Sequence, residues 1–200
     1  MKKYIFIVIA FVTIISCSKS ESELDRTIFI PDENNPNLPE YSEWGYNAFG
    51  AIYERTYFVA SNNIIPCKIM YSNDSIRFFM QGVMGNDYPN KKMSLAFTFP
   101  SEVIAEYNDL IILNKKVIDL RSNCVVMMAV EDNEKKLDII KGKLDFKRVQ
   151  QLRVDDIANR VILSGTFDIQ FVGAGSFPEN LSDGRFDFGI TEREFYYTTN

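Results

Sequence analysis

Residues 40–46 combine the residue types that proteins use to bind sugars. The stretch holds an indole, two phenol rings and a carboxylate in close succession: Trp44, Tyr41, Tyr46 and Glu43. Aromatic faces can stack on sugar rings, and carboxylate oxygens accept hydrogen bonds from hydroxyl groups. The same pattern would also arise if Trp44, the single tryptophan of the chain, were buried in the core or at a strand edge. The sequence therefore favours a buried Trp44, and these four residues are the candidate ligand site if the indole is exposed instead.

Carboxylate pairs occur elsewhere, but their spacing does not predict catalysis. Glu192 and Glu194 alternate on a predicted strand, and Asp155 and Asp156 are adjacent in a predicted turn. A glycosidase needs two carboxyl groups that face each other across a substrate at about 5 to 9 Å, and closeness in sequence does not establish this. Solvated strand faces and turns account for these residues. We therefore expect no catalytic residues and predict that the protein is not an enzyme.

The chain contains no histidine, which narrows the remaining chemistry. Ser-His-Asp and Cys-His nucleophiles and histidine-ligated metals are excluded. The acidic and amide side chains between Pro31 and Pro39 lack EF-hand spacing, so this segment is expected to be a solvated loop or linker. Gly173 to Gly175 is too short for a phosphate-binding loop. We expect no metal and no cofactor.

The first 17 residues predict where the chain goes. Two lysines, Lys2 and Lys3, precede the apolar run Tyr4 to Val12, which is too short for a membrane span. Ile14 to Cys17 ends in a small residue followed by cysteine. This segment resembles the cleavage site of bacterial lipoproteins, in which the cysteine is acylated on its sulfur, as with palmitate, and becomes the new amino terminus. The alternative is an ordinary secretory signal in which Cys17 occurs by chance.

The residues after Cys17 predict a tether and a membrane address. Ser18 to Glu23 is polar, charged and without apolar residues, as in a flexible segment. Its lysine and acidic residues resemble the export signal of Bacteroidota-type lipoproteins, which implies the outer membrane, at the cell surface or on the periplasmic face. Without Lys2 and Lys3 the basic residues fall from 22 to 20 against 27 acidic ones, a net charge of −7. Nucleic acid is therefore not an expected partner.

From Tyr41 onward, the hydrophobic pattern predicts β-strands. Apolar residues alternate with polar ones at Met93 to Phe99 and at Phe167 to Phe171, and Asp155 to Asn159 is expected to be the turn of a long hairpin. The fold is predicted to be all-β and antiparallel, either a two-sheet sandwich or a barrel, with at most one short helix. The expected division is a signal peptide at 1–16, a lipidated tether and loop at 17–40, and a single domain at 41–200.

Some local expectations are more specific. Ser101 is expected to cap a short helix that ends at Leu113 and buries the face formed by Ile104, Tyr107 and Ile111. Cys124 to Val130 is expected to be a strand covered on both faces, and Gly173 to Gly184 a loop. Cys67 and Cys124 are expected to be buried free thiols, although an oxidising compartment would also permit a disulfide between them.

Two short phrases, Ser164 to Phe167 and Asp183 to Asp187, resemble small Bacteroidota lipoproteins of uncharacterised function, some of which are calycin-like barrels. This resemblance implies no catalytic residues. The predicted function is a lipid-anchored, non-catalytic module that binds a glycan, a peptide or an apolar ligand. The alternatives are a structural or accessory subunit of an outer-membrane complex and, third, an acid-based hydrolase.

Overall fold

The computed structural model describes residues 26–61, 66–85, 91–101, 104–154 and 157–198. These residues form twelve β-strands: β1 (Ala48–Tyr53), β2 (Thr56–Ala60), β3 (Cys67–Tyr71), β4 (Ser75–Met84), β5 (Lys91–Pro100), β6 (Val117–Asp119), β7 (Val125–Val130), β8 (Asn133–Lys136), β9 (Ile139–Val154), β10 (Ile157–Val172), β11 (Pro178–Ile190) and β12 (Phe195–Tyr197). Three short 3-10 helices lie between strands of this described part of the chain: η2 (Tyr107–Leu113), η3 (Ala174–Ser176) and η4 (Glu192–Glu194). No helix among the described residues is long and apolar enough to span a membrane.

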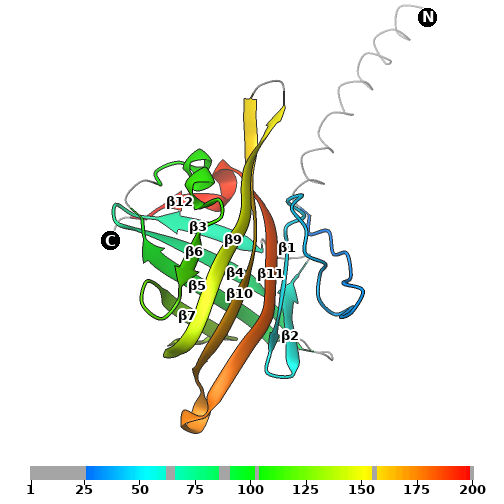
Figure 1. The fold of residues 1–200 in the computed structure, drawn as a ribbon, viewed down its shortest axis with the longest axis vertical. Helices are drawn as coiled ribbons and strands as arrows, with labels where there is room; N and C mark the ends of the chain where they lie inside the picture. Colours follow the sequence, from blue (N-terminus) through cyan, green and yellow to red (C-terminus); the bar gives the residue numbers. More distant parts are fainter. Residues whose placement is uncertain (1–25, 62–65, 86–90, 102–103, 155–156, 199–200) are drawn as a thin grey trace, which may run out of the picture.

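All twelve strands belong to one sheet that is curled into a half-barrel (Figure 1). The hydrogen-bonded order is β6-β9-β10-β11-β1-β2-β4-β5-β7-β8, and β3 pairs with β4 and β12 beside this path. Every pairing is antiparallel except that of β12 with β3. The predicted all-β, antiparallel class is confirmed. Because the strands form one continuous sheet curled into a half-barrel, the architecture is intermediate between a two-sheet sandwich and a closed barrel, the two alternatives that the sequence allowed.

The inner face of the half-barrel is packed with phenylalanine rings. Phe97 of β5 lies 5.6 Å from Phe167 of β10, and Phe78 of β4 lies 5.3 Å from Phe146 of β9, measured between ring centroids. These pairs join distant parts of the strand order, so the sheet closes over its own side chains. The predicted alternation is confirmed in β4, at Met93 to Phe99 and at Phe167 to Phe171, although Ala96 is buried as well. The buried alternating residues are Ile76, Phe78, Met80, Met93, Leu95, Phe97, Phe99, Phe167, Ile169 and Phe171.

The short helix differs in detail from its prediction. It begins after Glu106 rather than at Ser101, and the Asp109 carboxylate accepts hydrogen bonds from the backbone N–H groups of Ala105 and Glu106 at 3.0 and 2.9 Å. Because a 3-10 helix has three residues per turn, the core-facing side chains recur at every third position. Leu110 and Leu113 are therefore buried, whereas Ile111 is exposed.

Two strand predictions were wrong. β7 is covered on one face only, since Val126 and Met128 are buried while Val125 is exposed. β11 begins at Pro178, inside the segment predicted as a loop. The polar side chains of its first half face outward over a β-bulge, which hides the usual two-residue period. Cys67 and Cys124 are both free cysteines, Cys67 buried and Cys124 half-buried.

Residues 27–47, here called the strap, lie beside β1 (Figure 1) and are hydrogen-bonded to residues of β11. Arg185 of β11 donates to the Asp32 carboxylate at 2.7 Å, and the Gly189 N–H donates to Asn47 Oδ1 at 2.9 Å. Pro39 lies so close to β1 that a Cβ at Gly50 would be 2.4 Å from its Cδ atom. The predicted loop between Pro31 and Pro39 is thus held against the sheet rather than being a free linker.

Candidate functional site

The strap is held by the carboxylate of Asp187, which lies on the outer face of β11. The flanking residues Phe186 and Phe188 point into the core, and the period of two turns Asp187 outward. The strap covers it, so that only 3% of the residue is exposed. Ser164, its register partner on β10, donates its hydroxyl to Asp187 Oδ1 at 2.8 Å.

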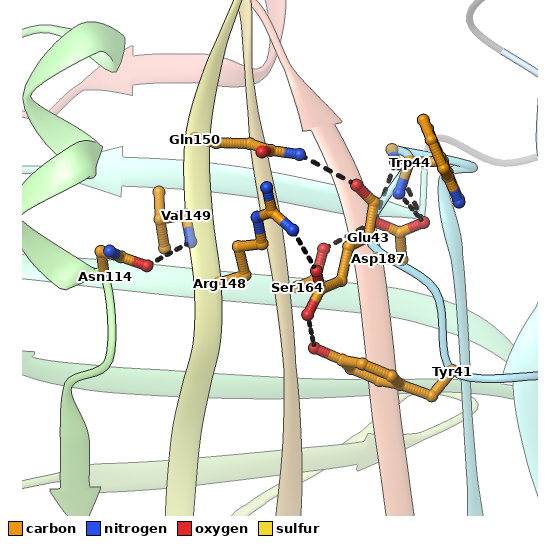
Figure 2. A network of polar contacts seen from close by, with 10 residues as sticks. Tyr41, Glu43, Trp44, Asn114, Arg148, Val149, Gln150, Ser164 and Asp187 are labelled. Carbon is orange, nitrogen blue, oxygen red and sulfur yellow. Dashed lines mark hydrogen bonds and ion pairs between the residues drawn. The ribbon is translucent and has the colours of Figure 1, made fainter.

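The same carboxylate accepts a series of hydrogen bonds from the strap (Figure 2). The backbone N–H groups of Trp44 and Tyr46 donate to Oδ2 at 3.2 and 3.1 Å. The Gly45 N–H is shared between the two oxygens at 2.9 and 3.0 Å, and the Ser42 hydroxyl also donates to Oδ2. A buried carboxylate is tolerated only when its oxygens are satisfied in this way. Asp187 therefore fixes the backbone of residues 44–46 and the side chain of Ser42.

Glycine is required at the centre of this turn. Gly45 has a φ of 75°, in the left-handed region that residues with a Cβ rarely adopt. A Cβ at this position would also lie 3.2 Å from a side-chain atom of Ile162 and 3.3 Å from the Cα of Gly189. The Gly45 backbone can therefore approach the sheet closely enough for three consecutive N–H groups to reach one carboxylate.

The indole of Trp44 is exposed, so the buried position that the sequence favoured is wrong. The residue is 73% exposed, although its backbone is fixed to Asp187. Figure 2 shows the indole on the side of the strap that faces away from β9. A large aromatic side chain in this position adds little buried area to the core, and its ring is accessible from solvent.

Glu43 and Tyr41 point the other way, toward β9. The Tyr41 hydroxyl donates to Glu43 Oε1 at 3.1 Å, and Arg148 donates to Glu43 Oε2 at 2.8 Å (Figure 2). The side-chain amide of Gln150 donates to the Glu43 carbonyl at 3.1 Å. Partial burial, followed by the hydrogen bond to Glu43, raises the pKa of Tyr41 above its usual value. These contacts hold the strap to the long hairpin.

The structure thus divides the four predicted binding residues. It brings Tyr41 and Glu43 together and turns Trp44 away from them, while Tyr46 is half-buried and contributes its backbone N–H to Asp187. Sequence reasoning missed Asp187 and Ser164, although an aspartate between two phenylalanines is visible as Phe186-Asp187-Phe188. Such a residue on a strand is usually solvated, and only the docked strap makes it buried.

Neither of the two carboxylate pairs seen in the sequence is found on the predicted element within the described ranges. Glu192 and Glu194 lie on η4 rather than on a strand, and Glu194 Oε2 accepts hydrogen bonds from the N–H and the hydroxyl of Thr191 at 2.9 and 2.6 Å. Asp155 and Asp156 lie outside the described residues. Among the residues that the structure does describe, no three Cys, Asp or Glu side chains are grouped as for a metal ion.

Comparisons with protein-family models, with curated proteins and with solved structures found no match. The resemblance to small Bacteroidota lipoproteins therefore stays a prediction from the sequence alone.

Proposed function

We propose that this protein is a lipid-anchored, non-catalytic binding module of the cell envelope that captures a glycan through Trp44. The anchor is the acylated Cys17, and the described part of the chain, beginning at residue 26, carries the binding surface. The outer membrane is the proposed location, because the sequence around Cys17 resembles that of exported lipoproteins.

The observation that carries the proposal is an exposed indole on a fixed backbone. Trp44 is 73% exposed, while its N–H and those of its two neighbours are bound to a buried carboxylate. Because the backbone that carries the ring is already fixed, binding does not have to order it, and pre-organisation of this kind favours binding. The ring offers the apolar face that a sugar ring stacks against.

The absence of histidine and the contacts of the carboxylates support binding rather than catalysis. Glu43 is paired with Arg148 and accepts the Tyr41 hydroxyl, and Asp187 is saturated by donors from the strap and from Ser164. Neither carboxylate is free to act as an acid or a nucleophile on a bound sugar.

The test uses the single tryptophan as its own reporter. The full-length protein, purified in a mild detergent, is titrated with host and plant oligosaccharides while the Trp44 fluorescence is recorded. Because stacking changes the polarity around an exposed indole, we expect a saturable shift with a binding glycan. Isothermal titration calorimetry with Trp44→Ala should show at least a tenfold loss of affinity, and Trp44→Phe a smaller one.

Phe177 provides a matched control, because it is 74% exposed and lies next to the other end of β11. Phe177→Ala should leave glycan affinity unchanged. If no glycan changes the Trp44 fluorescence, or if Trp44→Ala and Phe177→Ala bind glycan equally well, the platform is rejected.

A second candidate, an accessory subunit of an envelope complex, is favoured by one further observation. Ile28, Phe29 and Ile30 are 47%, 37% and 40% exposed, and the Ile28 N–H donates to the Tyr46 carbonyl at 2.8 Å. Apolar side chains therefore lie exposed beside the turn that carries Trp44, as at protein interfaces. Crosslinking in intact cells, with Ile28→Ser and Ile30→Ser as the variants, tests this alternative.

A further inference from the structure

A groove of about 570 Å³ lies on the outer face of the three longest strands. It is lined chiefly by outward-facing polar residues of β9, β10 and β11: Lys141, Lys143, Asp168, Gln170, Asn180 and Ser182. Its volume lies within the range of small-molecule sites, about 300 to 1,000 Å³. None of Tyr41, Glu43, Trp44 and Tyr46 lines it, so it is a separate site from the proposed platform.

The groove is built into the backbone by β-bulges. The pairing of β10 with β11 shifts register between Phe167 and Ile169, and the pairing of β1 with β11 shifts at the same part of β11. There Asp183 has a φ of 52°, directly before Gly184. The pairing of β9 with β10 shifts again between Gln170 and Phe171. Bulges bend a strand and re-aim its side chains, and they are frequent at binding sites.

The side chains in the groove are those that bind hydroxyl groups and isolated negative charges. Lys141 and Lys143 are two residues apart on one strand, so their side chains leave the same face about 7 Å apart. Both are exposed, and neither forms an ion pair within the part of the chain that the structure describes. Across from them, the Gln170 amide donates to Asn180 Oδ1 at 3.0 Å, and Ser182 adds a hydroxyl.

The acidic groups at the groove restrict the ligand. The Glu54 carboxylate accepts a hydrogen bond from the Asn180 backbone N–H. Asp168 lies opposite Lys143 in the β9–β10 register and accepts a long hydrogen bond of 3.3 Å from the Asp183 N–H. A chain with several sulfate or phosphate groups on each ring would be repelled by these carboxylates and by the net negative charge of the protein. A chain that carries one carboxylate per sugar ring, with hydroxyl groups between, would match both the lysines and the amides.

We propose that this groove binds an acidic oligosaccharide, a polyhydroxylated chain of uronic acids whose carboxylates pair with Lys141 and Lys143. Gln170, Asn180 and Ser182 exchange hydrogen bonds with its hydroxyl groups. The inference stands on the groove and does not require Trp44. It also assigns the outer face of β9 to β11 as a binding surface.

The test is calorimetric titration of the full-length protein with short oligogalacturonates and alginate oligomers at low salt. We expect saturable binding that weakens as salt is added, because the lysines are exposed and therefore screened. The fully methyl-esterified oligogalacturonate has the same backbone without the charge, and its affinity should be at least tenfold lower. The double variant Lys141→Ala with Lys143→Ala should lose a similar factor.

The control variant is Lys91→Ala with Lys92→Ala, which removes the same charge from exposed positions at the start of β5. It should bind as the unchanged protein does. Trp44→Ala should also retain acidic-oligosaccharide binding, so failure of the platform and failure of the groove are distinguishable. The proposal is overturned if no acidic oligosaccharide binds, if the ester binds equally well, if the two lysine pairs behave alike, or if polyglutamate of the same charge binds as tightly.

Discussion

The Gly45 backbone N–H lies 2.9 Å and 3.0 Å from the two carboxylate oxygens of Asp187, which is 142 residues further along the chain. This contact joins the strap to the outer face of a strand whose other face lines the core. It explains why Trp44 has a fixed backbone and an exposed ring. The candidate platform therefore depends on a residue that does not touch the proposed ligand.

Replacing Asp187 with alanine should destabilise the protein by about 3 kcal/mol or more, because it leaves several buried donors without an acceptor. Urea denaturation followed by circular dichroism measures the change in the free energy of unfolding. Asp187→Asn should be less severe, since one carbonyl oxygen remains. The exposed Asp138 provides a control, and Asp138→Ala should change stability by less than about 0.5 kcal/mol. Equal stability of Asp187→Ala and Asp138→Ala would show that the strap is not held as described.

The alternation of apolar and polar residues predicted the β-strands well, because side-chain burial repeats every two residues in a strand with one buried face. In Met93 to Phe99 and in Phe167 to Phe171, the alternate apolar residues are buried as expected. The curling of the sheet into a half-barrel could not be predicted, since it depends on contacts such as Phe97 with Phe167, which join strands far apart in sequence. Nothing near Phe97 in the sequence indicates its partner.

The site was only partly predictable for the same reason. The aromatic and acidic residue types of the strap marked Trp44 and Glu43, but their directions are set by Asp187 and Arg148, which approach from β11 and β9. The first half of β11 was missed because a bulge at Asp183 interrupts its alternation. Bulges need one residue in an unusual conformation, and an aspartate before a glycine is compatible with a turn as well as with a bulge.

The ion pair between Asp32 and Arg185 should make the strap sensitive to acid. The Arg185 hydrogen bond, followed by those from the backbone N–H groups of Asn35 and Asn34, holds the pKa of Asp32 below its ordinary value of 3.8. A carboxyl group with a lowered folded-state pKa stabilises the fold above its unfolded pKa, and this contribution is lost as the pH falls through the lower folded value. Asp32→Asn should therefore be less stable than the unchanged protein at pH 7 and at pH 5.

Urea denaturation of Asp32→Asn at pH 7, 5 and 3 checks this expectation. The difference from the unchanged protein should be constant between pH 7 and 5 and should begin to shrink below about pH 3.8. Glu33→Gln, at the exposed neighbouring residue, is the control. A difference that is as large at pH 3 as at pH 7 would mean that the charge of Asp32 does not hold the strap.

The anchor can be tested independently of the fold. If Cys17 is acylated, metabolic labelling with a fatty acid should mark the full-length protein, and Cys17→Ser should abolish both the label and membrane partitioning. Cys124→Ser should leave both unchanged. Should Cys17→Ser still be labelled and still partition with membranes, the lipoprotein hypothesis is wrong, and an ordinary secretory signal would be the better interpretation.

The two remaining cysteines should react slowly in the folded protein. Burial raises the pKa of the Cys124 thiol to about 12, and burial followed by the nearby Glu194 carboxylate raises that of Cys67 as well. Since the thiolate is the reactive form, a raised pKa lowers the rate at any pH below it. At pH 8 we expect both thiols to react with a disulfide reagent at least about 100-fold more slowly than in urea, where the pKa returns to its ordinary range.

Under non-reducing conditions, urea should release two titratable thiols from Cys17→Ser. Cys67→Ser introduced into that variant should release one. Finding no thiols without a reductant would mean that Cys67 and Cys124 are paired, and would contradict the free thiols of the structure.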